Sequence, residues 1–284
     1  MGALNAKQAS LEDESLAGNW NDQGIRILWT GGWDSTFRVL YATLVEGKRV
    51  EPHYIIDTGR PSSLRELKAI ADVKALLKGS HPDAYERIDS LEITSKDEIP
   101  EDAEITQAWI RLKQRSHLGG QYDWLARYAH SKSLTDLELS AHVDDKLYDF
   151  LQGHVERAPS GGYRIKTTVD SDERIFSRFE FPILNYSKTH MRDLAKAHGF
   201  LTILEKSWFC HEPRGGMPCG MCNPCAYTVE EGMGYRLPRD ARFRYRTRRY
   251  RGAVTDFTKF VRRSLADIEV FRRAYDYMRY GAKH

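Results

Sequence analysis

The stretch that decides the fold covers residues 24–35 and reads GIRILWTGGWDS. Its apolar run, Ile25–Trp29, is typical of a buried parallel strand. The run stops at Thr30-Gly31-Gly32, which predicts a tight turn. Apolar residues then recur at three- and four-residue spacing, at Phe37, Leu40, Tyr41 and Leu44. The stretch therefore predicts a strand, a turn and a helix that ends near Gly47.

The turn and the helix start have the features of an anion-binding site. Because Gly31 and Gly32 lack Cβ atoms, backbone N–H groups can approach a phosphate, and the helix N-terminus adds about half a positive charge. Thr30 and Ser35 supply hydroxyl donors, and Asp34 and Ser35 are favourable N-cap residues. The alternative is a plain tight turn capped by Asp34. We predict a phosphate loop at the place where an open α/β sheet binds its ligand.

Two common nucleotide-binding motifs are missing from the sequence. Gly47-Lys48-Arg49 lacks the upstream glycine of G-x-x-x-x-G-K-[ST], and no G-x-G-x-x-G follows an apolar run. The remaining motif resembles the S-G-G-x-D-S loop of the PP-loop ATP pyrophosphatases, with Thr30 in place of the usual serine. In that superfamily ATP is cleaved between its α- and β-phosphates, the substrate is adenylylated, and the loop holds the departing pyrophosphate.

Strand and helix patterns alternate along the rest of the chain. Such alternation implies right-handed crossovers and a doubly wound, mostly parallel α/β sheet. Pro61 opens a helix that is expected to bury one apolar face, formed by Leu64, Leu67, Ile70 and Val73. The other expected elements are strands at 51–57, 88–94 and 137–139, a hairpin within 155–169 turned by Gly161-Gly162, and helices at 105–114, 122–129 and 187–198.

The composition limits the class of protein. With 284 residues, 41% hydrophobic and 29% charged, the chain fits one or two packed domains, and wholesale disorder is excluded. No window approaches the roughly 18 uninterrupted apolar residues of a membrane helix. Residues 1–22 are polar and aperiodic, without the basic and apolar regions of a secretory signal. We therefore expect a cytoplasmic protein with a mobile leader at residues 1–22.

The four cysteines of the chain form one cluster with gaps of eight, two and two residues. Two overlapping C-x-x-C units can direct three thiolates to one centre, and the longer loop brings in the fourth. Cys210, Cys219, Cys222 and Cys225 are therefore predicted to hold a closed, structural Zn²⁺ site. The alternatives are an iron–sulfur cluster, disulfides or free thiols. His211 is a substitute ligand of awkward geometry because it adjoins Cys210.

Together, a PP-loop and the pattern C-x8-C-x2-C-x2-C resemble the bacterial 7-cyano-7-deazaguanine synthase family of the queuosine pathway. Residues 182–184, 188–191 and 199–200 look like the Pro-Leu…Lys-x-Glu-Ile…Gly segment of that family. Residues 57–60 loosely echo its Asp-Tyr-Gly-Gln-Arg stretch. The resemblance covers roughly residues 25–236.

The resemblance implies a carbon–nitrogen ligase that converts ATP to AMP and pyrophosphate. The family activates the carboxylate of 7-carboxy-7-deazaguanine, accepts ammonia to give the amide, then adenylylates the amide oxygen and eliminates to the nitrile. It also implies Zn²⁺ on the cysteines and a phosphate contact for Lys188, which otherwise is a solvated lysine on a helix face. Mg²⁺ is expected beside the phosphates. The residues implied to hold ATP are Thr30, Gly31, Gly32, Asp34 and Ser35.

The chain departs from the family near the implied base site. The family's Tyr-Pro-Asp-Cys-Arg segment is missing, and residues 141–150 read AHVDDKLYDF instead. His142, Asp144 and Asp145 follow the fourth expected strand, so they are candidate site residues. Helix capping is the alternative role for Asp144. The resemblance therefore bears on ATP use more than on the acyl acceptor.

A strongly basic segment follows the cysteines. Residues 236–284 carry 15 Lys+Arg and 5 Asp+Glu, a net +10, whereas residues 1–235 carry a net −7. Arginines interleaved with Phe243, Tyr245 and Tyr250 suit a nucleic acid, and they equally suit an acidic protein whose amine must reach the adenylate. A third interpretation is a C-terminal helix packed on the body, with its arginines paired to acidic groups.

Two other activities stay open at this point. Relatives of the family in antiviral defence operons join a deazaguanine to a protein amino terminus, so a protein amine is the alternative to ammonia. A PP-loop sulfur transferase acting on tRNA is a second alternative, and it requires a reactive or cluster-bound cysteine pair. We expect four regions: the leader at 1–22, an ATP-binding domain at 23–205, a zinc-binding loop at 206–235 and a basic helical extension at 236–284.

Overall fold

The structure, a computed structural model, describes residues 24–248. The leader expected at residues 1–22 and the part of the basic extension after residue 248 lie outside the described residues. The chain divides into two compact units, Met1–Phe209 and Cys210–His284, called units 1 and 2 below.

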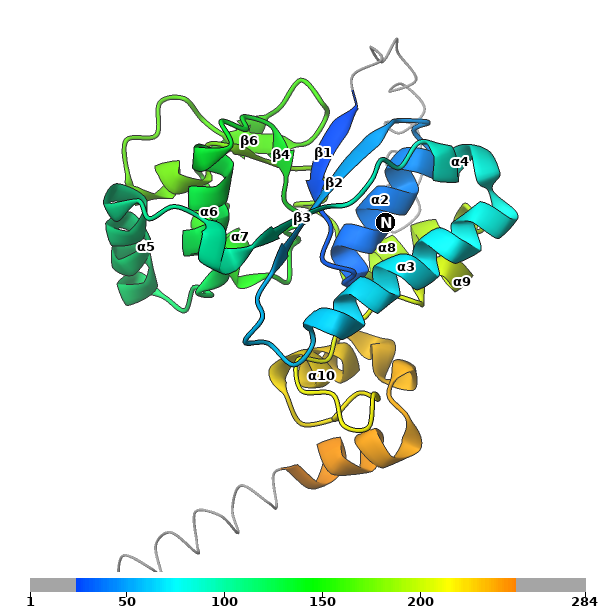
Figure 1. Ribbon diagram of the computed structural model, residues 1–284. Coiled ribbons are helices and arrows are strands. Elements are labelled where there is room, and N and C mark those ends of the chain that lie inside the picture. The colour runs from blue at the N-terminus through cyan, green and yellow to red at the C-terminus, as the bar shows by residue number, and fades with distance from the viewer. Residues whose placement is uncertain (1–23, 249–284) are drawn as a thin grey trace, which may run out of the picture. The chain divides into compact units, whose positions relative to one another are not determined.

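Unit 1 is built on a seven-stranded sheet with the order β3-β2-β1-β4-β7-β6-β5 (Figure 1). In this spatial order the first five strands, β3, β2, β1, β4 and β7, pair in parallel. The strand β6 pairs antiparallel with both of its neighbours, β7 and β5. The predicted class, a doubly wound and mostly parallel α/β sheet, is therefore confirmed. The strands are β1 (Ile25–Leu28), β2 (Val50–Ile56), β3 (Glu92–Ser95), β4 (Leu137–Glu138), β5 (Val155–Arg157), β6 (Tyr163–Ile165) and β7 (Phe179–Phe181).

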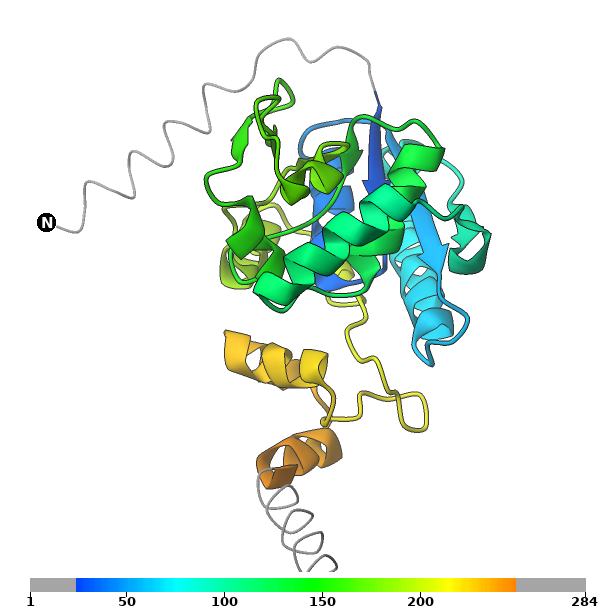
Figure 2. The same cartoon turned by 90° about the vertical axis from the view of Figure 1, so that its left-hand side faces the viewer.

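Helices cover both faces of this sheet. One layer contains α2 (Trp33–Leu44), α3 (Ser63–Ser80), α4 (Pro82–Glu86), α8 (Lys188–Ala197) and α9 (Leu201–Leu204). The other contains α5 (Ala103–Arg115), α6 (Gln121–Ser131) and α7 (Lys146–Leu151), and in Figure 2 α5 and α6 lie in front of the strands. Short 3₁₀ turns occur at η1 (Lys96–Glu98) and η2 (Asp172–Phe176).

The strand order makes β1 the point where the winding changes direction. From β1 the chain proceeds to β2 and β3 at one edge, then returns to β4 on the other side of β1. The loops that leave β1 and β4 therefore diverge, and a crevice opens at the carboxyl ends of these two strands. Residues after β1 and after β4 can meet there although they lie about a hundred positions apart in sequence.

The hairpin expected around Gly161-Gly162 is present between β5 and β6. Gly161 has a φ of +93°, and the Ala158 N–H donates to the Gly162 carbonyl at 2.9 Å. The two strands pair antiparallel, with Glu156 opposite Arg164. A glycine relieves the strain of the left-handed conformation at this turn.

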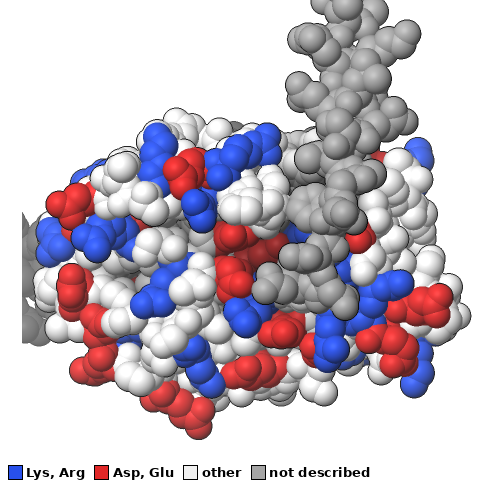
Figure 3. Space-filling model, turned by 90° about the horizontal axis from the view of Figure 1, so that it is seen from above, with Lys and Arg blue, Asp and Glu red and all other residues white. Residues whose placement is uncertain are grey.

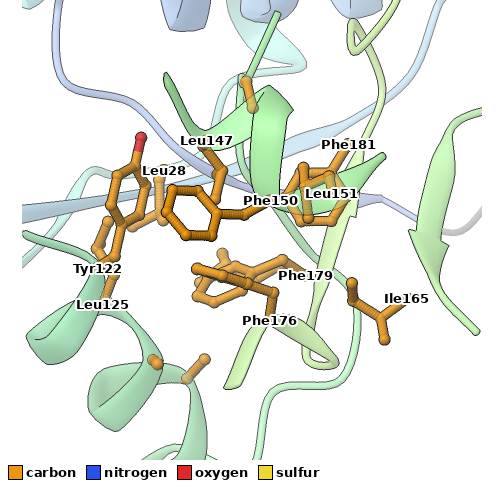
Figure 4. Close-up of a cluster of buried hydrophobic side chains, with 14 of the residues drawn as sticks. Leu28, Tyr122, Leu125, Leu147, Phe150, Leu151, Ile165, Phe176, Phe179 and Phe181 are labelled. Atoms are coloured by element: carbon orange, nitrogen blue, oxygen red, sulfur yellow. The ribbon is translucent and has the colours of Figure 1, made fainter. Parts of the chain in front are cut away.

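A cluster of large apolar side chains packs α6 and α7 against the sheet. The ring of Tyr122 from α6 stacks edge-on with Phe176 at 5.9 Å between centroids. In Figure 4 the Tyr122 ring lies beside Phe150 of α7, with its hydroxyl at the margin of the cluster. Because each fully buried ring of this size contributes roughly 1.5–3 kcal/mol, the cluster fixes α6 and α7 beside the crevice.

A buried ion pair ties α2 to β4. Arg38 donates through Nε and Nη2 to the carboxylate of Glu138 at 2.7 and 2.9 Å, and the two side chains are 5% and 3% exposed. Arg38 also donates to Glu46 at 2.9 Å. Burial alone would lower the pKa of Arg38, but the charges of Glu138 and Glu46 raise it further than burial lowers it. The pair therefore stays charged and holds α2 against the strand that leads to His142.

Two expectations are wrong, one about the buried face of a helix and one about a helix cap. Leu64 is 78% exposed, because α3 starts at Ser63 and turns its other apolar residues, such as Ile70 and Val73, toward the sheet. The cap of α2 is Gly32, so Asp34 and Ser35 lie inside the first turn and do not cap it. The helix begins earlier than its apolar spacing indicates because the turn at Gly31 directs the chain into the helix at once.

Charges are interspersed on the surface of the described residues. In the view of Figure 3, basic and acidic side chains alternate over the visible face. Many of them pair, as Arg26 does with Asp136 at 2.7 Å and Arg49 with Asp89 at 2.7 Å. Within residues 24–248, no helix combines the length and the apolar character needed to cross a membrane.

Unit 2 is described from Cys210 to residue 248. Its helix α10 (Asn223–Thr228) starts directly after Cys222 and has proline in its first turn, where the missing N–H costs nothing. A π turn, η3 (Val229–Met233), and a 3₁₀ turn, η4 (Gly234–Arg236), follow. Residues 239–248 are helical. Gly220 has a φ of +72°, and any Cβ there would collide with the Ala241 carbonyl, so the cysteine loop and this helix pack closely.

Candidate functional site

The loop between β1 and α2 is held in a compact conformation by its own residues. Gly31 has a φ of +70°, and a Cβ at this position would lie 2.6 Å from the carbonyl oxygen of Glu66. The hydroxyl of Ser35 accepts from the Thr30 N–H at 3.2 Å and lies 3.2 Å from the Thr30 hydroxyl. Both the left-handed conformation and the close approach of α3 therefore require glycine at position 31.

The start of α2 is open to a ligand. Its cap residue, Gly32, has no side chain to accept from the N–H groups of the first turn. A helix of 12 residues with an uncapped N-terminus is a favourable place for an anion. Asp34 lies in this first turn, and its Oδ1 atom is buried without a hydrogen-bond partner among the described residues. Because a buried carboxylate oxygen without a donor is costly, a cation beside the anion would satisfy it.

The chain brings His142 to Asp34 from the other side of the crevice. His142 is buried just after β4, and its Nε2 lies 3.6 Å from Asp34 Oδ1. Its Nδ1 accepts from the Asp144 N–H at 3.2 Å. A neutral imidazole that accepts through Nδ1 carries its proton on Nε2 and so presents that proton to Asp34. The structure therefore unites Thr30, Gly31, Gly32, Asp34, Ser35 and His142.

A pocket of about 160 Å³ opens beside Thr30, Gly32, Asp34 and Ser35, between β1, β2, β4 and α6. It is smaller than the roughly 300–1,000 Å³ of most ligand pockets, so in this conformation it suits one ring-sized group. One wall contains Asp34 and Ser35, and the opposite wall contains Tyr122 and Trp124. Tyr122 donates to Asp145 at 3.3 Å, and burial followed by the Asp145 charge raises the pKa of Tyr122 well above its usual value.

The lining of the pocket includes Arg60, which pairs with Glu66. Glu66 accepts from Tyr54 at 2.9 Å and from Ser62 at 2.7 Å, and it pairs with Arg60 Nη2 at 3.4 Å. Burial, followed by the Glu66 charge, raises the pKa of Tyr54, so its hydroxyl remains a donor. Arg60 and Glu66 both line the pocket. The arrangement places a guanidinium where it can contact an anionic group.

Four of the predicted site residues do not line this pocket, as far as the chain is described: Gly31, His142, Asp144 and Lys188. Lys188 is the half-exposed first residue of α8. Asp144 is 47% exposed in its side chain. Its backbone N–H donates to His142 Nδ1 at 3.2 Å, and its carboxylate lies 3.8 Å from the same nitrogen. The cap of α7 is Asp145, whose side chain accepts from the Leu147 N–H at 3.0 Å, so the capping role considered for Asp144 is wrong.

Sequence reasoning missed several polar residues in the pocket walls, namely Tyr54, Glu66, Gln121, Tyr122 and two that carry unsatisfied atoms, His53 and Ser140. His53 lies inside β2, and Ser140 follows β4. The Nε2 atom of His53 and the hydroxyl of Ser140 are both buried without hydrogen-bond partners among the residues described. For His53, the sequence signal was a histidine within a mostly apolar parallel strand. No comparable signal marks Ser140.

The four cysteines form one compact set of sulfur atoms, and no disulfide joins them. All four Sγ atoms lie within 4.8 Å of one another, with 3.8 Å between Cys219 and Cys225 and 3.9 Å between Cys222 and Cys210. Four ligands at about 2.3 Å from a tetrahedral ion are about 3.8 Å apart. The predicted clustering of these cysteines into a metal site is therefore confirmed in its geometry.

The spacing of the sulfurs fits one metal ion better than a cluster. In a four-iron cluster each thiolate binds a different iron, so the sulfurs lie farther apart. Backbone N–H groups also point at the sulfurs, as from Cys219 to Cys210 Sγ at 3.1 Å and from Cys222 to Cys219 Sγ at 3.3 Å. These donors favour the thiolate forms that a metal requires.

Part of the basic segment is used inside unit 2. Arg244 donates through Nε to the Cys219 carbonyl at 2.7 Å and pairs with Asp240 at 2.7 Å. Arg248 pairs with Glu230 at 3.1 Å and stacks on Tyr245. Of the three interpretations of this segment, packing therefore accounts for these two arginines. The apolar positions after residue 248 lie outside the described residues.

Comparison with known proteins gives fold-level similarity only. No protein-family model matches the chain, and no curated protein matches it. Among solved structures, NMN synthetase from Francisella tularensis matches 70% of this chain and 71% of its own, with 13% identity and a TM-score of 0.34. The U34-tRNA thiolase NcsA from Methanococcus maripaludis, described with its [4Fe-4S] cluster, matches 84% of this chain and 76% of its own, with 11% identity and a TM-score of 0.40. Likeness at this level assigns neither a substrate nor an activity.

Proposed function

We propose that this protein is an ATP-dependent carbon–nitrogen ligase that forms AMP and pyrophosphate, adenylylates a carboxylate and passes the acyl group to a nitrogen nucleophile. The observation that carries the proposal is the loop between β1 and α2. It combines a positive-φ glycine, an uncapped helix start and a buried carboxylate oxygen, Asp34 Oδ1, that lacks a hydrogen-bond partner among the described residues. An anion and a hard cation bound together fit this set of groups.

Each residue of the loop has a distinct role in this proposal. The N–H groups at the start of α2 and the hydroxyls of Thr30 and Ser35 bind the phosphates that leave as pyrophosphate. Asp34 would hold Mg²⁺, which neutralises phosphate charge when it is bound. His142, 3.6 Å from Asp34, orients the carboxylate. Lys188 stays a proposed phosphate contact, carried by the family resemblance.

The chemistry explains why ATP is needed. A carboxylate is a poor acyl donor because its oxygen is a bad leaving group. When a carboxylate oxygen attacks the α-phosphorus of ATP, the bond to the β-phosphate oxygen breaks and pyrophosphate leaves. Nitrogen then attacks the carbonyl carbon and AMP leaves. Preorganised N–H donors and cations stabilise the charge that accumulates on the phosphates.

For the acyl donor we propose a deazaguanine carboxylate, with ammonia as the nitrogen source. The resemblance supports this choice, and the pocket supports a planar ring, because Tyr122, Trp124 and Leu139 line it. A protein amine is the alternative acceptor. Sulfur transfer to tRNA is less well supported, because all four cysteines of the chain belong to one compact set.

Product analysis tests the proposed activity. The full-length protein is incubated with ATP, Mg²⁺, 7-carboxy-7-deazaguanine and ammonium, and the products are identified by mass spectrometry. We expect AMP, pyrophosphate and a deazaguanine amide or nitrile. Formation of AMP without an ammonia adduct until a protein acceptor is added would support the protein-amine alternative. A reaction mixture without AMP under all of these conditions would contradict the proposal.

We further propose that the cysteine set holds Zn²⁺ in a structural role. Four thiolates complete a tetrahedral shell and leave no position for a catalytic water. The proposed division of the chain stays as predicted, with an ATP-binding domain at 23–205, a zinc-binding loop at 206–235 and a basic extension from 236. The packing of Arg244 on Cys219 supports a role for the start of the extension in covering the metal loop.

We also propose that residues 239–248 present one face to single-stranded nucleic acid. Arg239, Arg242, Phe243 and Arg246 follow helical i, i+3, i+4, i+7 spacing and are all exposed, Phe243 by 65%. Ala241, at the back of this helix, is buried. Guanidinium groups that flank an exposed ring suit phosphates that flank a base, whereas an acidic protein would not require the ring.

Binding of a fluorescein-labelled single-stranded oligonucleotide tests this surface. Replacing Arg239, Arg242 and Arg246 together with Ala is expected to raise the Kd about tenfold or more at low salt. It should also lower the slope of log affinity against log salt by about 2, because each lost phosphate contact removes roughly 0.7. The control replaces three exposed lysines of unit 1, Lys68, Lys78 and Lys113. An unchanged Kd and slope in the arginine variant would refute this surface.

A further inference from the structure

A buried histidine in the wall of the pocket has one ring nitrogen engaged and the other without a hydrogen-bond partner among the described residues. His53 is only 7% exposed. Its Nδ1 lies 2.9 Å from the Tyr128 hydroxyl, whereas its Nε2 is buried with no hydrogen-bond partner within the described part of the chain. His53 lines the same pocket as Asp34 and Ser35. An unsatisfied buried nitrogen at a ligand cavity is costly unless a ligand completes it.

The parallel sheet determines which groups surround the ring. His53 on β2 is in register with Leu28 on β1 and with Glu92 on β3, so the three side chains are cross-strand neighbours. Helix α6 covers this part of the sheet and contributes Tyr128. His53 Nδ1 therefore has the Glu92 carboxylate at 3.3 Å as well as the Tyr128 hydroxyl at 2.9 Å.

These neighbours decide where the proton of a neutral His53 lies. The Tyr128 hydroxyl hydrogen-bonds to Glu92, and this bond contributes to a lowered pKa of the Glu92 carboxyl and a raised pKa of the Tyr128 hydroxyl. A tyrosine that donates to Glu92 accepts from His53, and Glu92 itself can only accept. The proton therefore lies on Nδ1, and Nε2 carries the lone pair.

We propose that His53 Nε2 is the general base that takes the proton from the attacking nitrogen, with Glu92 and Tyr128 as positioning residues. This inference rests on the proposed function. In the transfer step nitrogen attacks the carbonyl carbon, a carbon–nitrogen bond forms, the bond to the AMP oxygen breaks, and one N–H proton moves to Nε2. A carboxylate behind the base stabilises the imidazolium that results.

The size of the pocket supports a shared ligand. A ligand in a space of about 160 Å³ touches the wall with His53 and the wall with Asp34 at once. An acyl group activated at the loop can therefore present its carbonyl carbon to a nitrogen beside Nε2. A base that binds its substrate proton directly contributes typically 10²–10⁴-fold to the rate.

The charges around His53 set the pH dependence. Burial lowers the pKa of His53, and Glu92 and Glu51 oppose this effect, while Arg26 and Lys132 add to it. The free base therefore predominates at neutral pH. The transfer rate, expressed per concentration of unprotonated ammonia, is expected to fall only as the pH drops below the ordinary histidine range. On the pocket side the titratable and charged neighbours are Asp34, Tyr54, Arg60, Glu66, Tyr122 and Asp145.

Two half-reactions of the full-length protein separate this role from the others. Carboxylate-dependent exchange between ATP and labelled pyrophosphate reports adenylylation, and formation of the amide from ammonium reports transfer. His53→Asn keeps a polar group toward Tyr128 and removes Nε2. We expect transfer to fall about 10²-fold or more, with exchange changed less than about threefold. The acidic limb of the transfer pH profile should disappear.

A second nucleophile and two further variants test the same role of His53. Hydroxylamine, which is largely unprotonated at neutral pH and is a stronger nucleophile, should reduce the defect of His53→Asn. Glu92→Gln should lower transfer by a smaller factor and leave exchange intact. His117→Asn, at an exposed position between α5 and α6, is the control and should match the wild type.

Three results would overturn the inference. Equal losses of exchange and transfer in His53→Asn would make His53 a ligand-binding residue and not a base. A variant with wild-type transfer and an unchanged pH profile would remove His53 from the reaction. If the wild type itself shows no carboxylate-dependent exchange, the proposed function is contradicted, and the inference about His53 falls with it. If the wild type is active and only one of the first two results is seen, the inference alone is contradicted.

Discussion

Replacing Asp34 with Asn is expected to reduce pyrophosphate release by roughly 10²–10³-fold while the fold stays intact. The amide has nearly the shape of the carboxylate, so the first turn of α2 and the contact with His142 at 3.6 Å can persist. The negative oxygen that would hold Mg²⁺ is lost, however, and that oxygen is the atom left without a partner among the residues described. The measurement is the initial rate of pyrophosphate release with ATP and 7-carboxy-7-deazaguanine, together with a circular dichroism melt.

The variant Ser35→Ala tests the same loop by removing one of its hydroxyl groups. Its hydroxyl accepts from the Thr30 N–H at 3.2 Å, so the variant loses both a phosphate donor and a contact that shapes the loop. Asp72→Asn is the control, because Asp72 pairs only with Lys68 on the surface of α3, at 2.8 Å. Such a surface pair contributes about 0.3–0.5 kcal/mol and has no route to the pocket. Pyrophosphate release at the wild-type rate in Asp34→Asn would end the assignment of this loop to ATP.

Removal of the metal is expected to unfold unit 2. The apparent free energy of binding of a structural Zn²⁺ is about 10–16 kcal/mol, which is as large as the whole stability of many domains. Apart from the cysteines, only small groups of apolar residues, such as Ala226, Met233 and Leu237, are buried in the described part of this unit. A core of that size does not fold by itself, so the metal supplies the difference.

The experiment compares wild type, chelator-treated protein and Cys222→Ser. We expect one zinc ion per chain in the wild type by elemental analysis, and loss of that zinc in the variant. Melting should then show an early transition, and limited proteolysis should cut within residues 210–248. Met217→Ala is the control, since Met217 lies in the same loop, is 51% exposed and ligates nothing. An identical melting curve without metal, or iron and sulfide in place of zinc, would contradict the structural-zinc proposal.

Sequence patterns alone predicted the features that depend on residues close together along the chain. The strand, turn and helix of residues 24–44 follow from an apolar run, two glycines and a helical repeat. The clustering of the cysteines follows from their short gaps, and the β5–β6 hairpin from its glycine pair. In each case the interacting groups are joined by a few bonds, so local geometry leaves few alternatives.

Features that depend on which segments meet in space were decided by the tertiary structure. Apolar spacing did not show that Leu64 faces solvent, because burial depends on where α3 lies over the sheet. His142 was a candidate by its position after a strand, but its approach to Asp34 exists only because β4 pairs with β1.

His53 illustrates the same limit most clearly. In sequence it is a single histidine in a mostly apolar strand, whereas in the fold Glu92 and Tyr128 from two other elements lie at one ring nitrogen, Nδ1. The residues of the chain by themselves determined a glycine turn that leads into a helix, a compact set of four cysteines and a wound α/β sheet. The partners of each buried polar atom depend on strand register and helix packing, which follow from the free energy of the whole core and not from any one stretch.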